Sequence, residues 1–361
     1  MGKDNNFWDK LKNFWEKNVA KSRTGQLVIA LIFITVFFWI AEDKFMRVQT
    51  YKSMLLQMSE LGILAIAVFI CILVGGLNVS VMASANLSAV MAGMFILRFT
   101  GSAGYWADQA TAVDTTLAIE NMTNTQINLL ILGAVGIAIA VGTLAGLLNG
   151  LIVGYFHLPP LLATIGSGFL YTGIFKGITG GESIFGYPEN LEFIGNGEIL
   201  GIPFPFYLFL ILSVVMFYVL NYTKLGYRIM MTGANETTAI FSGINTRDIK
   251  LKTFTMAGTL SAIAGMIILG RTMSANYDYG LATYVLFTIF VAVISGSRAG
   301  FGTVINIFIA MFALQSLQTG FNYMLQTVRG NTYFRDFIWG VLLIVFLIIN
   351  YYANVRQVEE G

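Results

Sequence analysis

Apolar segments close to the length of a membrane span recur along almost the whole chain. A helix needs about 20 apolar residues to cross the hydrocarbon core of a bilayer. Ten segments, some of them short or discontinuous, are predicted as membrane helices, and they cover residues 26–41, 61–77, 79–97, 128–154, 161–178, 206–222, 253–270, 284–296, 303–320 and 337–352. The sequence therefore predicts an all-α polytopic membrane protein, with eight or nine full spans if one short segment is re-entrant.

The low content of charged residues supports this fold class. Charged residues make up 11% of the chain and hydrophobic residues 56%, whereas a typical soluble domain contains about 25% charged residues. A soluble fold of this length could not keep so much apolar side chain away from water. We expect one membrane domain over residues 26–352 and a short cytoplasmic tail over residues 353–361.

Residues 1–25 are expected to form an amphipathic cytoplasmic helix. Five large apolar residues recur there at helical spacing among four lysines, and they are Phe7, Trp8, Leu11, Phe14 and Trp15. This pattern is typical of a helix that lies in the membrane interface, although a loosely ordered basic tail is the alternative. The segment has no short apolar core followed by a cleavage site, so it does not resemble a cleavable signal peptide.

The placement of Lys and Arg predicts that both termini are cytoplasmic. With the N-terminus inside, thirteen of the 21 Lys and Arg residues fall on the inner side and seven on the outer side, as the positive-inside rule requires. The connections at residues 98–127 and 179–205 then face outward, and together they carry seven carboxylates but only one arginine. The loop at residues 223–252 is cytoplasmic and basic.

Glycines interrupt the apolar pattern at residues 75–78 and again at residues 295–302. The piece from residue 61 to the first break has about 15 helical residues, or about 22 Å, which predicts that this break lies within membrane depth. Paired, glycine-interrupted segments point to the substrate path of a transporter. The alternative is a tight cytoplasmic turn between two spans.

A glycine stands at every fourth position on one face of the segment 128–154. These glycines are Gly142, Gly146, Gly150 and Gly154. Because a glycine lets a neighbouring backbone approach closely, the stripe predicts helix packing. Asn149 lies beside this face and is expected either to hydrogen-bond a neighbouring helix or to line the path.

The loop at residues 223–252 contains a short predicted helix over residues 235–242. Asn235 can cap its start, Glu236 suits the positive end of its dipole, and Gly243 can end it in the left-handed conformation. A helix this short is not stable alone in water, and it leaves apolar groups on a cytoplasmic surface, namely Ile240, Phe241 and Ile244. It must therefore pack against its own membrane domain or against a partner subunit.

Four motifs in a fixed order carry a resemblance over residues 58–352. They are GGLNVSV at 75–81, GLLNGLIV at 146–153 followed by PPLLATIG at 159–166, GANETTAIFSGIN at 233–245, and RTMSANYDYG at 271–280. On these motifs the chain resembles the membrane permeases of bacterial binding-protein-dependent ABC importers for monosaccharides of the ribose, galactoside and xylose type. It departs from the family pattern at Asn78, which is usually Asp, at Met82, which is usually Gly, and at residues 295–302, where the family prefers paired glycines.

The resemblance implies an assembly of several chains in the bacterial cytoplasmic (inner) membrane. Two permease chains, identical or different, would form the pathway, and cytoplasmic ATPase subunits would touch the helix at residues 235–242. An extracytoplasmic binding protein would deliver the sugar to the acidic outer loops. The sequence contains no G-x-x-x-x-G-K-[ST] phosphate loop, so the partner subunit would hydrolyse ATP and this chain would bind no cofactor or metal.

Neutral polar residues within the apolar segments are the candidates for the path. These are Asn78, Ser80, Asn86, Asn149 and Thr164, and their amide and hydroxyl groups suit the hydroxyls of a sugar, although hydrogen bonding between helices is the alternative for each. Tyr277, Asp278 and Tyr279 are expected near the outer mouth, where they would contact the sugar or the binding protein, or belong to the interfacial aromatic belt.

An enzyme, a secondary carrier and a permease for another solute would each need particular polar groups in the spans. A membrane-embedded enzyme would need clustered acids, His or a nucleophile–base pair in the spans, and none is evident. The predicted spans contain almost no ionisable residue, which argues against an ion-coupled secondary carrier and leaves no partner for an amino-acid zwitterion. Permeases for nucleosides or branched-chain amino acids share the broader fold and stay as alternatives, and the sequence does not identify the sugar.

Overall fold

The computed structural model describes residues 22–99, 122–326 and 341. Several expectations lie outside the described residues, and they concern nearly all of the N-terminal amphipathic segment, most of the connection 98–127, nearly all of the segment 337–352, and the tail 353–361.

Nine of the predicted segments correspond to helices. In chain order these are α2 (Arg23–Ala41), α3 (Val48–Leu73), α4 (Val81–Phe99), α6 (Asn124–Gly154), α7 (Pro160–Thr179), α9 (Phe204–Tyr222), α12 (Thr246–Thr272), α13 (Thr283–Ile294) and α14 (Val304–Met324). Within the described part of the chain, eight of them are long and apolar enough to cross a membrane, and α13, with 12 residues, is not. The predicted all-α polytopic class is confirmed.

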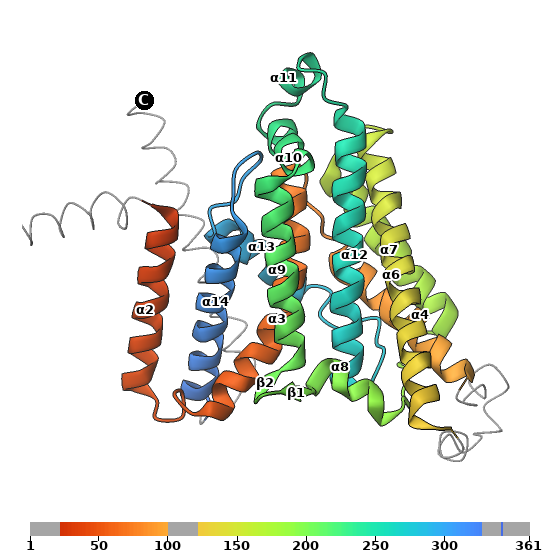
Figure 1. The fold of residues 1–361 in the computed structure, drawn as a ribbon, viewed down its shortest axis with the longest axis vertical. Helices are drawn as coiled ribbons and strands as arrows, with labels where there is room; N and C mark the ends of the chain where they lie inside the picture. The colour runs from red at the N-terminus through yellow and green to blue at the C-terminus, as the bar shows by residue number, and fades with distance from the viewer. Residues whose placement is uncertain (1–21, 100–121, 327–340, 342–361) are drawn as a thin grey trace, which may run out of the picture.

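The long helices run side by side, and the short elements gather at the two ends of the bundle (Figure 1). One end carries α10 (Lys224–Ala234) and α11 (Glu236–Phe241), and we call it the α11 end. The opposite end, the hairpin end, carries four small elements, which are η3 (Glu189–Leu191), α8 (Glu192–Asn196), β1 (Glu198–Ile199) and β2 (Ile202–Pro203). The two strands pair antiparallel, with Ile199 opposite Ile202.

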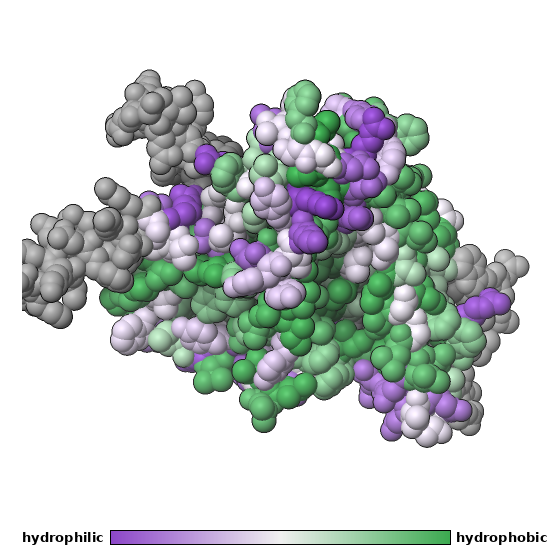
Figure 2. All heavy atoms as spheres, turned by 45° about the horizontal axis from the view of Figure 1, so that its top comes forward, coloured by the Kyte–Doolittle hydropathy of each residue, from purple (hydrophilic) through white to green (hydrophobic). Residues whose placement is uncertain are grey.

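The hydrophobic core sits between α3, α4 and α12, most of whose residues are buried. By contrast, α2, α6, α7 and α9 bury only a minority of their apolar residues and expose large ones such as Phe33, Leu129 and Phe169. Figure 2 shows this apolar surface over the middle of the bundle, with hydrophilic residues gathered near the α11 end. Such a surface is stable against lipid or another apolar chain and not against water, so the chain is a multi-pass membrane protein.

The glycine stripe of α6 faces the backbone of α12. A Cβ atom on Gly146 would lie 2.4 Å from the carbonyl oxygen of Phe254, and one on Gly150 would lie 2.7 Å from that of Leu251. Gly142 and Gly154 meet α12 in the same way. Because the two backbones are this close, no side chain larger than hydrogen fits between them, and α6 and α12 form one rigid unit.

The two glycine breaks meet at the α11 end. The amide of Gly300, in the break between α13 and α14, donates to the carbonyl oxygen of Leu73, the last residue of α3, at 2.9 Å. A Cβ atom on Gly233 of α10 would lie only 1.8 Å from the same oxygen. The two glycine breaks therefore lie against each other near this end of the bundle.

The expectation that α3 is too short to span is wrong. The helix begins at Val48 and has 26 residues, or about 39 Å at 1.5 Å per residue. Its first turns contain Gln, Thr, Lys and Ser. Because these residues are polar, the first turns do not belong to the apolar segment by which the span was predicted. The first break thus follows a complete span.

The packing of α6 on α12 generates a prediction with a control in the same helix. We expect Gly146→Ala to destabilise the protein by about 1–3 kcal/mol, because the methyl group would overlap the Phe254 carbonyl. Gly136→Ala is the control, since a Cβ atom there meets nothing within 4 Å. Thermal unfolding of the detergent-purified variants measures the difference, and equal melting temperatures would contradict the close packing.

Candidate functional site

Four of the five predicted path residues converge in one buried group. Asn149 of α6 donates to Ser80 Oγ at 2.8 Å, and Ser80 Oγ donates to Asn78 Oδ1 at 2.8 Å. Thr164 of α7 donates to the carbonyl oxygen of Leu77 at 3.1 Å. Tyr171, which the sequence analysis did not single out, donates to the Ala145 carbonyl at 2.7 Å and lies 3.3 Å from Asn149 Oδ1. We call Asn78, Ser80, Asn149, Thr164 and Tyr171 the amide cluster.

The amide cluster ties a non-helical segment to two helices. Residues 74–80 form the linker between α3 and α4. The first three amides of this linker still bond to carbonyls in the last turns of α3, whereas the amides of Val79 and Ser80 bond to side chains. Thr164 Oγ1 accepts from the amide of Val79 at 3.3 Å, and Asn78 Oδ1 accepts from the amide of Ser80 at 3.0 Å. Since unpaired polar groups are costly when they are buried, these side chains stabilise the linker in the interior of the bundle. All five residues of the cluster are at most 2% exposed.

Asn86, the fifth predicted path residue, lies apart from the cluster. Its side chain on α4 donates to the carbonyl oxygens of Tyr277 and Tyr279 at 3.1 and 3.0 Å. It thus holds the linker between α12 and α13, which contains the three predicted mouth residues. Of these, Asp278 is exposed, and the ring of Tyr277 lies 4.3 Å from the ammonium of Lys176.

A second polar group, which the sequence analysis missed, connects α3, α12 and α13. Arg271 Nη1 donates to Glu60 Oε1 at 2.7 Å, and the hydroxyl of Tyr284 donates to the same oxygen at 2.8 Å. The hydroxyls of Tyr279 and Tyr284 are 3.1 Å apart. We call Glu60, Arg271, Tyr279 and Tyr284 the ionic network. Tyr279 is the only predicted mouth residue whose side chain belongs to it.

Glu60 is an ionisable residue inside a span, where the sequence analysis expected almost none. Glu60 is fully buried near the middle of α3, about 18 Å from the first residue of the helix. Its Oε2 atom is buried without a hydrogen-bond partner among the described residues. Glu60 stands just before the apolar run that begins at Leu61, so hydropathy placed it outside the span. Its partner Arg271 is 211 positions away, and no sequence spacing connects them.

The loop between α9 and α12 contains two short helices, α10 and α11. Asn235 caps α11 by accepting from the amide of Thr238 at 3.0 Å. Gly243 follows with φ of 77°, and the amide of Ile244 donates to the carbonyl of Ala239 at 3.0 Å, which closes the helix. Figure 1 shows α11 at the outermost tip of the bundle.

The α11 helix exposes apolar side chains at that tip. Ala239 is fully buried and Ile244 packs against the core, but Ile240 is 55% exposed and Phe241 is 87% exposed. Glu236 is held 2.6 Å from Lys250 of α12. Burial acts to raise the pKa of Glu236, but the Lys250 ammonium outweighs it and keeps that pKa below its usual value, so the ion pair is present at neutral pH. The helix is therefore held in place while its apolar tip is free.

The polar groups of the amide cluster and the ionic network are suited to recognition by hydrogen bonds. The amide cluster and the ionic network offer neutral hydroxyl and amide groups together with a carboxylate that a guanidinium neutralises. In the ranges 22–99 and 122–326, no three His, Cys, Asp or Glu side chains come together in a way that could hold a metal ion. A hydroxyl-rich, uncharged solute is the ligand class that such groups suit best.

Comparison with known proteins gives a consistent picture. Residues 50–347 match the family model described as branched-chain amino acid transport system / permease component. The ribose import permease protein of Haemophilus influenzae is 26% identical over 335 residues, which cover 91% of this chain and 93% of the relative. No solved structure matches the chain.

Two further relatives cover the chain to a similar extent. The xylose/arabinose import permease protein of Sulfolobus acidocaldarius is 27% identical over 342 residues, covering 93% of this chain and 87% of the relative. The D-allose transport system permease protein of Escherichia coli is 24% identical over 341 residues, covering 93% of this chain and 92% of the relative.

The buried ion pair generates a prediction about stability. We expect Arg271→Gln to lower the free energy of unfolding by about 3–5 kcal/mol, because it leaves the Glu60 carboxylate buried without a countercharge. The double variant Glu60→Gln/Arg271→Gln should recover most of this loss. Lys52→Gln is the control, because the Lys52–Glu198 pair is exposed and should be worth about 1 kcal/mol or less. Thermal unfolding in detergent tests the set, and a double variant no more stable than Arg271→Gln would refute the pairing.

Proposed function

The chain belongs to the family described as the permease component of branched-chain amino acid transport systems, and from this premise we propose that it is the membrane-spanning permease subunit of an ATP-driven importer for a small sugar. Relatives named for the import of ribose, xylose or arabinose, and D-allose align with nearly the whole chain. Their names support a monosaccharide over a nucleoside or an amino acid. On this proposal the chain forms the pathway, performs no catalysis itself, and resides in the cytoplasmic (inner) membrane.

The exposed tip of α11 is the observation that carries the ATP-driven part of the proposal. Ile240 and Phe241 stand at the end of the bundle, next to the basic residues of the cytoplasmic loop. An apolar tip at that position faces neither the lipid nor the core of its own chain. A cytoplasmic ATPase subunit with an apolar cleft would cover it, and α11 with its caps Asn235 and Gly243 would be the coupling helix.

The polar groups inside the bundle support the sugar part of the proposal. The amide cluster lies near the α11 end, Asn86 lies beyond it on α4, and Asn86 contacts the linker that contributes Tyr279 to the ionic network. These residues form a series of hydrogen-bonding groups on elements that meet around α4. A sugar would exchange its bonds to water for bonds to such groups as it crosses.

The ionic network argues against the alternative function of an ion-coupled carrier. A carboxylate within a span is the usual site of proton or sodium coupling, and Glu60 is such a group. Its Oε1 atom, however, is held by Arg271 and Tyr284, so the pair is already neutral. This supports ATP as the energy source, with Glu60 as a structural or sugar-binding group.

Three partners follow from the proposal. A second permease chain, identical or different, would complete the pathway. The ATPase would bind the α11 end, and an extracytoplasmic sugar-binding protein would bind the hairpin end. Glu189 and Glu192 are exposed there, which gives that end an acidic face for a basic partner.

Docking of the ATPase is tested by removing the most exposed apolar group. Phe241→Ala should reduce recovery of a nucleotide-binding subunit with the tagged chain by at least tenfold, since a buried interface aromatic is worth about 2 kcal/mol or more. Phe169→Ala is the control, because Phe169 is 75% exposed but lies halfway along α7, out of reach of a soluble partner. Quantitative mass spectrometry of the purified complexes measures the ratio, and full recovery with Phe241→Ala would exclude α11 as the docking site.

Recognition of the sugar is tested at Tyr279. Tyr279→Phe should raise the KM for sugar uptake about fivefold, because it removes one hydrogen bond to the sugar of about 1 kcal/mol. The melting temperature should fall only slightly, because the contact between the Tyr279 and Tyr284 hydroxyls is lost. Tyr207→Phe is the control, since the hydroxyl of Tyr207 contacts only the exposed Ile199 carbonyl at the hairpin end. Uptake of labelled sugar by cells with equal expression gives the KM. An unchanged KM would remove Tyr279 from the path.

A further inference from the structure

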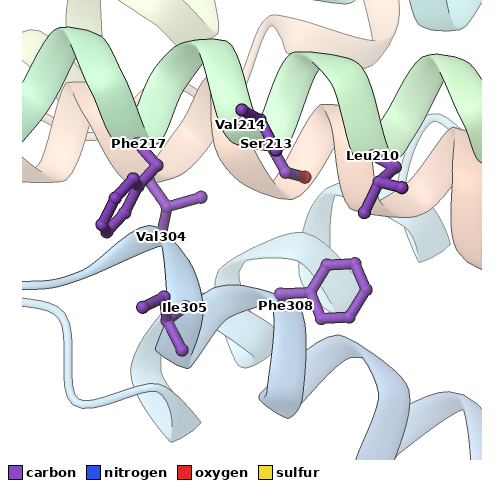
Figure 3. A pocket seen from close by; sticks show the side chains of 7 residues that line it. All are labelled: Leu210, Ser213, Val214, Phe217, Val304, Ile305 and Phe308. Carbon is purple, nitrogen blue, oxygen red and sulfur yellow. The ribbon is translucent and has the colours of Figure 1, made fainter.

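An apolar groove runs between α9 and α14 on the outside of the bundle (Figure 3). One wall is formed by α9 and the other by α14, and the lining side chains are Leu210, Ser213, Val214, Phe217, Val304, Ile305 and Phe308. The cavity has a volume of about 250 Å³. Ser213 is the only polar lining residue, and its hydroxyl is bonded to the Phe209 carbonyl at 2.7 Å. The groove therefore offers only apolar surface.

The same face of α9 leads from this groove to a polar pocket at the α11 end. Leu210, Val214, Phe217 and Asn221 follow at intervals of three or four residues, so they lie along one stripe of the helix. Asn221 lines a pocket of about 560 Å³ together with other residues of α9, of α10 and of the turn after α11, among them Tyr222, Lys224, Tyr227, Arg228 and Gly243. The rings of Phe217 and Tyr222 are in contact, with centroids 6.1 Å apart. Groove and pocket are thus neighbours on one helix.

The pocket carries two exposed cations. Lys224 and Arg228 are both exposed and one turn apart on α10. In the described part of the chain no carboxylate forms an ion pair with either of them. The two carboxylates of the loop have other partners: Glu236 pairs with Lys250, and Asp248 accepts hydrogen bonds from two other side chains. The pocket therefore presents a net positive charge to an anionic ligand.

The aromatic residues of the pocket place it at the membrane–water boundary. Tyr222 is 70% exposed and Tyr227 is 63% exposed, and Tyr218 stacks on Tyr222 one turn deeper on α9. Exposed tyrosines mark the level of the lipid headgroups. Helix α10 buries Ile229 and Thr232 on one side while Lys224 and Arg228 are exposed on the other, as in helices that lie in the interface.

We infer that the groove and the pocket together form a binding site for an anionic phospholipid of the cytoplasmic leaflet. One acyl chain lies in the groove between α9 and α14, and the headgroup phosphate is bound by Lys224 and Arg228. A free phosphate would account for the two cations but not for the apolar groove. A second protein chain could fill the groove, but it would not account for the two adjacent cations next to the groove. Ser242 and Gly243 line the same pocket, so the bound headgroup touches the turn that ends α11. In the complex with an ATPase, which rests on the proposed function, the bound lipid would also stabilise α11.

Native mass spectrometry of the full-length chain in mixed micelles tests this site. The wild type should retain phosphatidylglycerol in preference to phosphatidylcholine. The double variant Lys224→Gln/Arg228→Gln should lose about thirtyfold in phosphatidylglycerol affinity, given about 1 kcal/mol for each basic residue near an anionic surface. The charge-preserving swap Lys224→Arg/Arg228→Lys should restore it. Arg247→Gln/Lys252→Gln, which removes two exposed cations of α12 at the same end, is the matched control and should change nothing.

A second variant examines the groove separately from the charges. Val214→Trp fills the groove, so it should weaken phosphatidylglycerol binding while leaving the binding of inorganic phosphate unchanged. The inference is overturned if both lipids bind equally, or if Lys224→Gln/Arg228→Gln retains phosphatidylglycerol at the wild-type level. It is also overturned if Val214→Trp dissociates a dimer without affecting lipid retention, since the groove would then hold a second copy of the chain. Melting temperatures of all variants show whether each one is folded, and lipid retention is compared only among folded variants.

Discussion

The close contact of α12 with α6 and α4 is the constraint on which the rest of the structure depends. Gly258 of α12 faces Gly142 of α6 so closely that a Cβ atom on Gly258 would lie 2.2 Å from the Gly142 carbonyl oxygen. On α4, the carbonyl of Ala85 approaches Gly265 of α12 in the same manner. Helix α12 has 27 residues and is about 40 Å long. It starts just after α11 and carries Arg271 in its last turn, so one tightly packed helix connects the α11 end to the ionic network.

Some of the polar side chains inside the bundle pair with backbone that departs from helix. Thr164 and Asn78 satisfy the linker at residues 74–80, and Asn86 satisfies the carbonyls of the linker at residues 273–282. Irregular backbone within a membrane is stable only with such internal partners. The same linkers bring Asn78 and Tyr279 into the interior, where neutral hydrogen-bonding groups suit a sugar. The structural role and the proposed transport role thus rest on the same few residues.

Periodicity and composition predicted the helices well because each apolar segment is a local signal. The caps of α11 were equally visible, since Asn235 and Gly243 act on backbone groups only a few residues away. The first turns of α3 were missed because their polar residues interrupt the apolar run, and Glu60 was excluded from its span for the same reason. The pairing of Glu60 with Arg271 depends on the packing of α3 against α12, which no local pattern encodes. The groove between α9 and α14 likewise arises from tertiary packing alone.

The most direct test of the account is transport by a defined complex in vesicles. The tagged chain would be purified together with its ATPase subunit, reconstituted into proteoliposomes, and supplied with its binding protein and a panel of labelled monosaccharides, nucleosides and branched-chain amino acids. The account predicts that one monosaccharide accumulates above its external concentration only when ATP reaches the ATPase subunit. Equilibration of a solute without ATP would contradict the proposal of an ATP-driven importer. Accumulation of an amino acid or a nucleoside in place of a sugar would contradict the proposed substrate class.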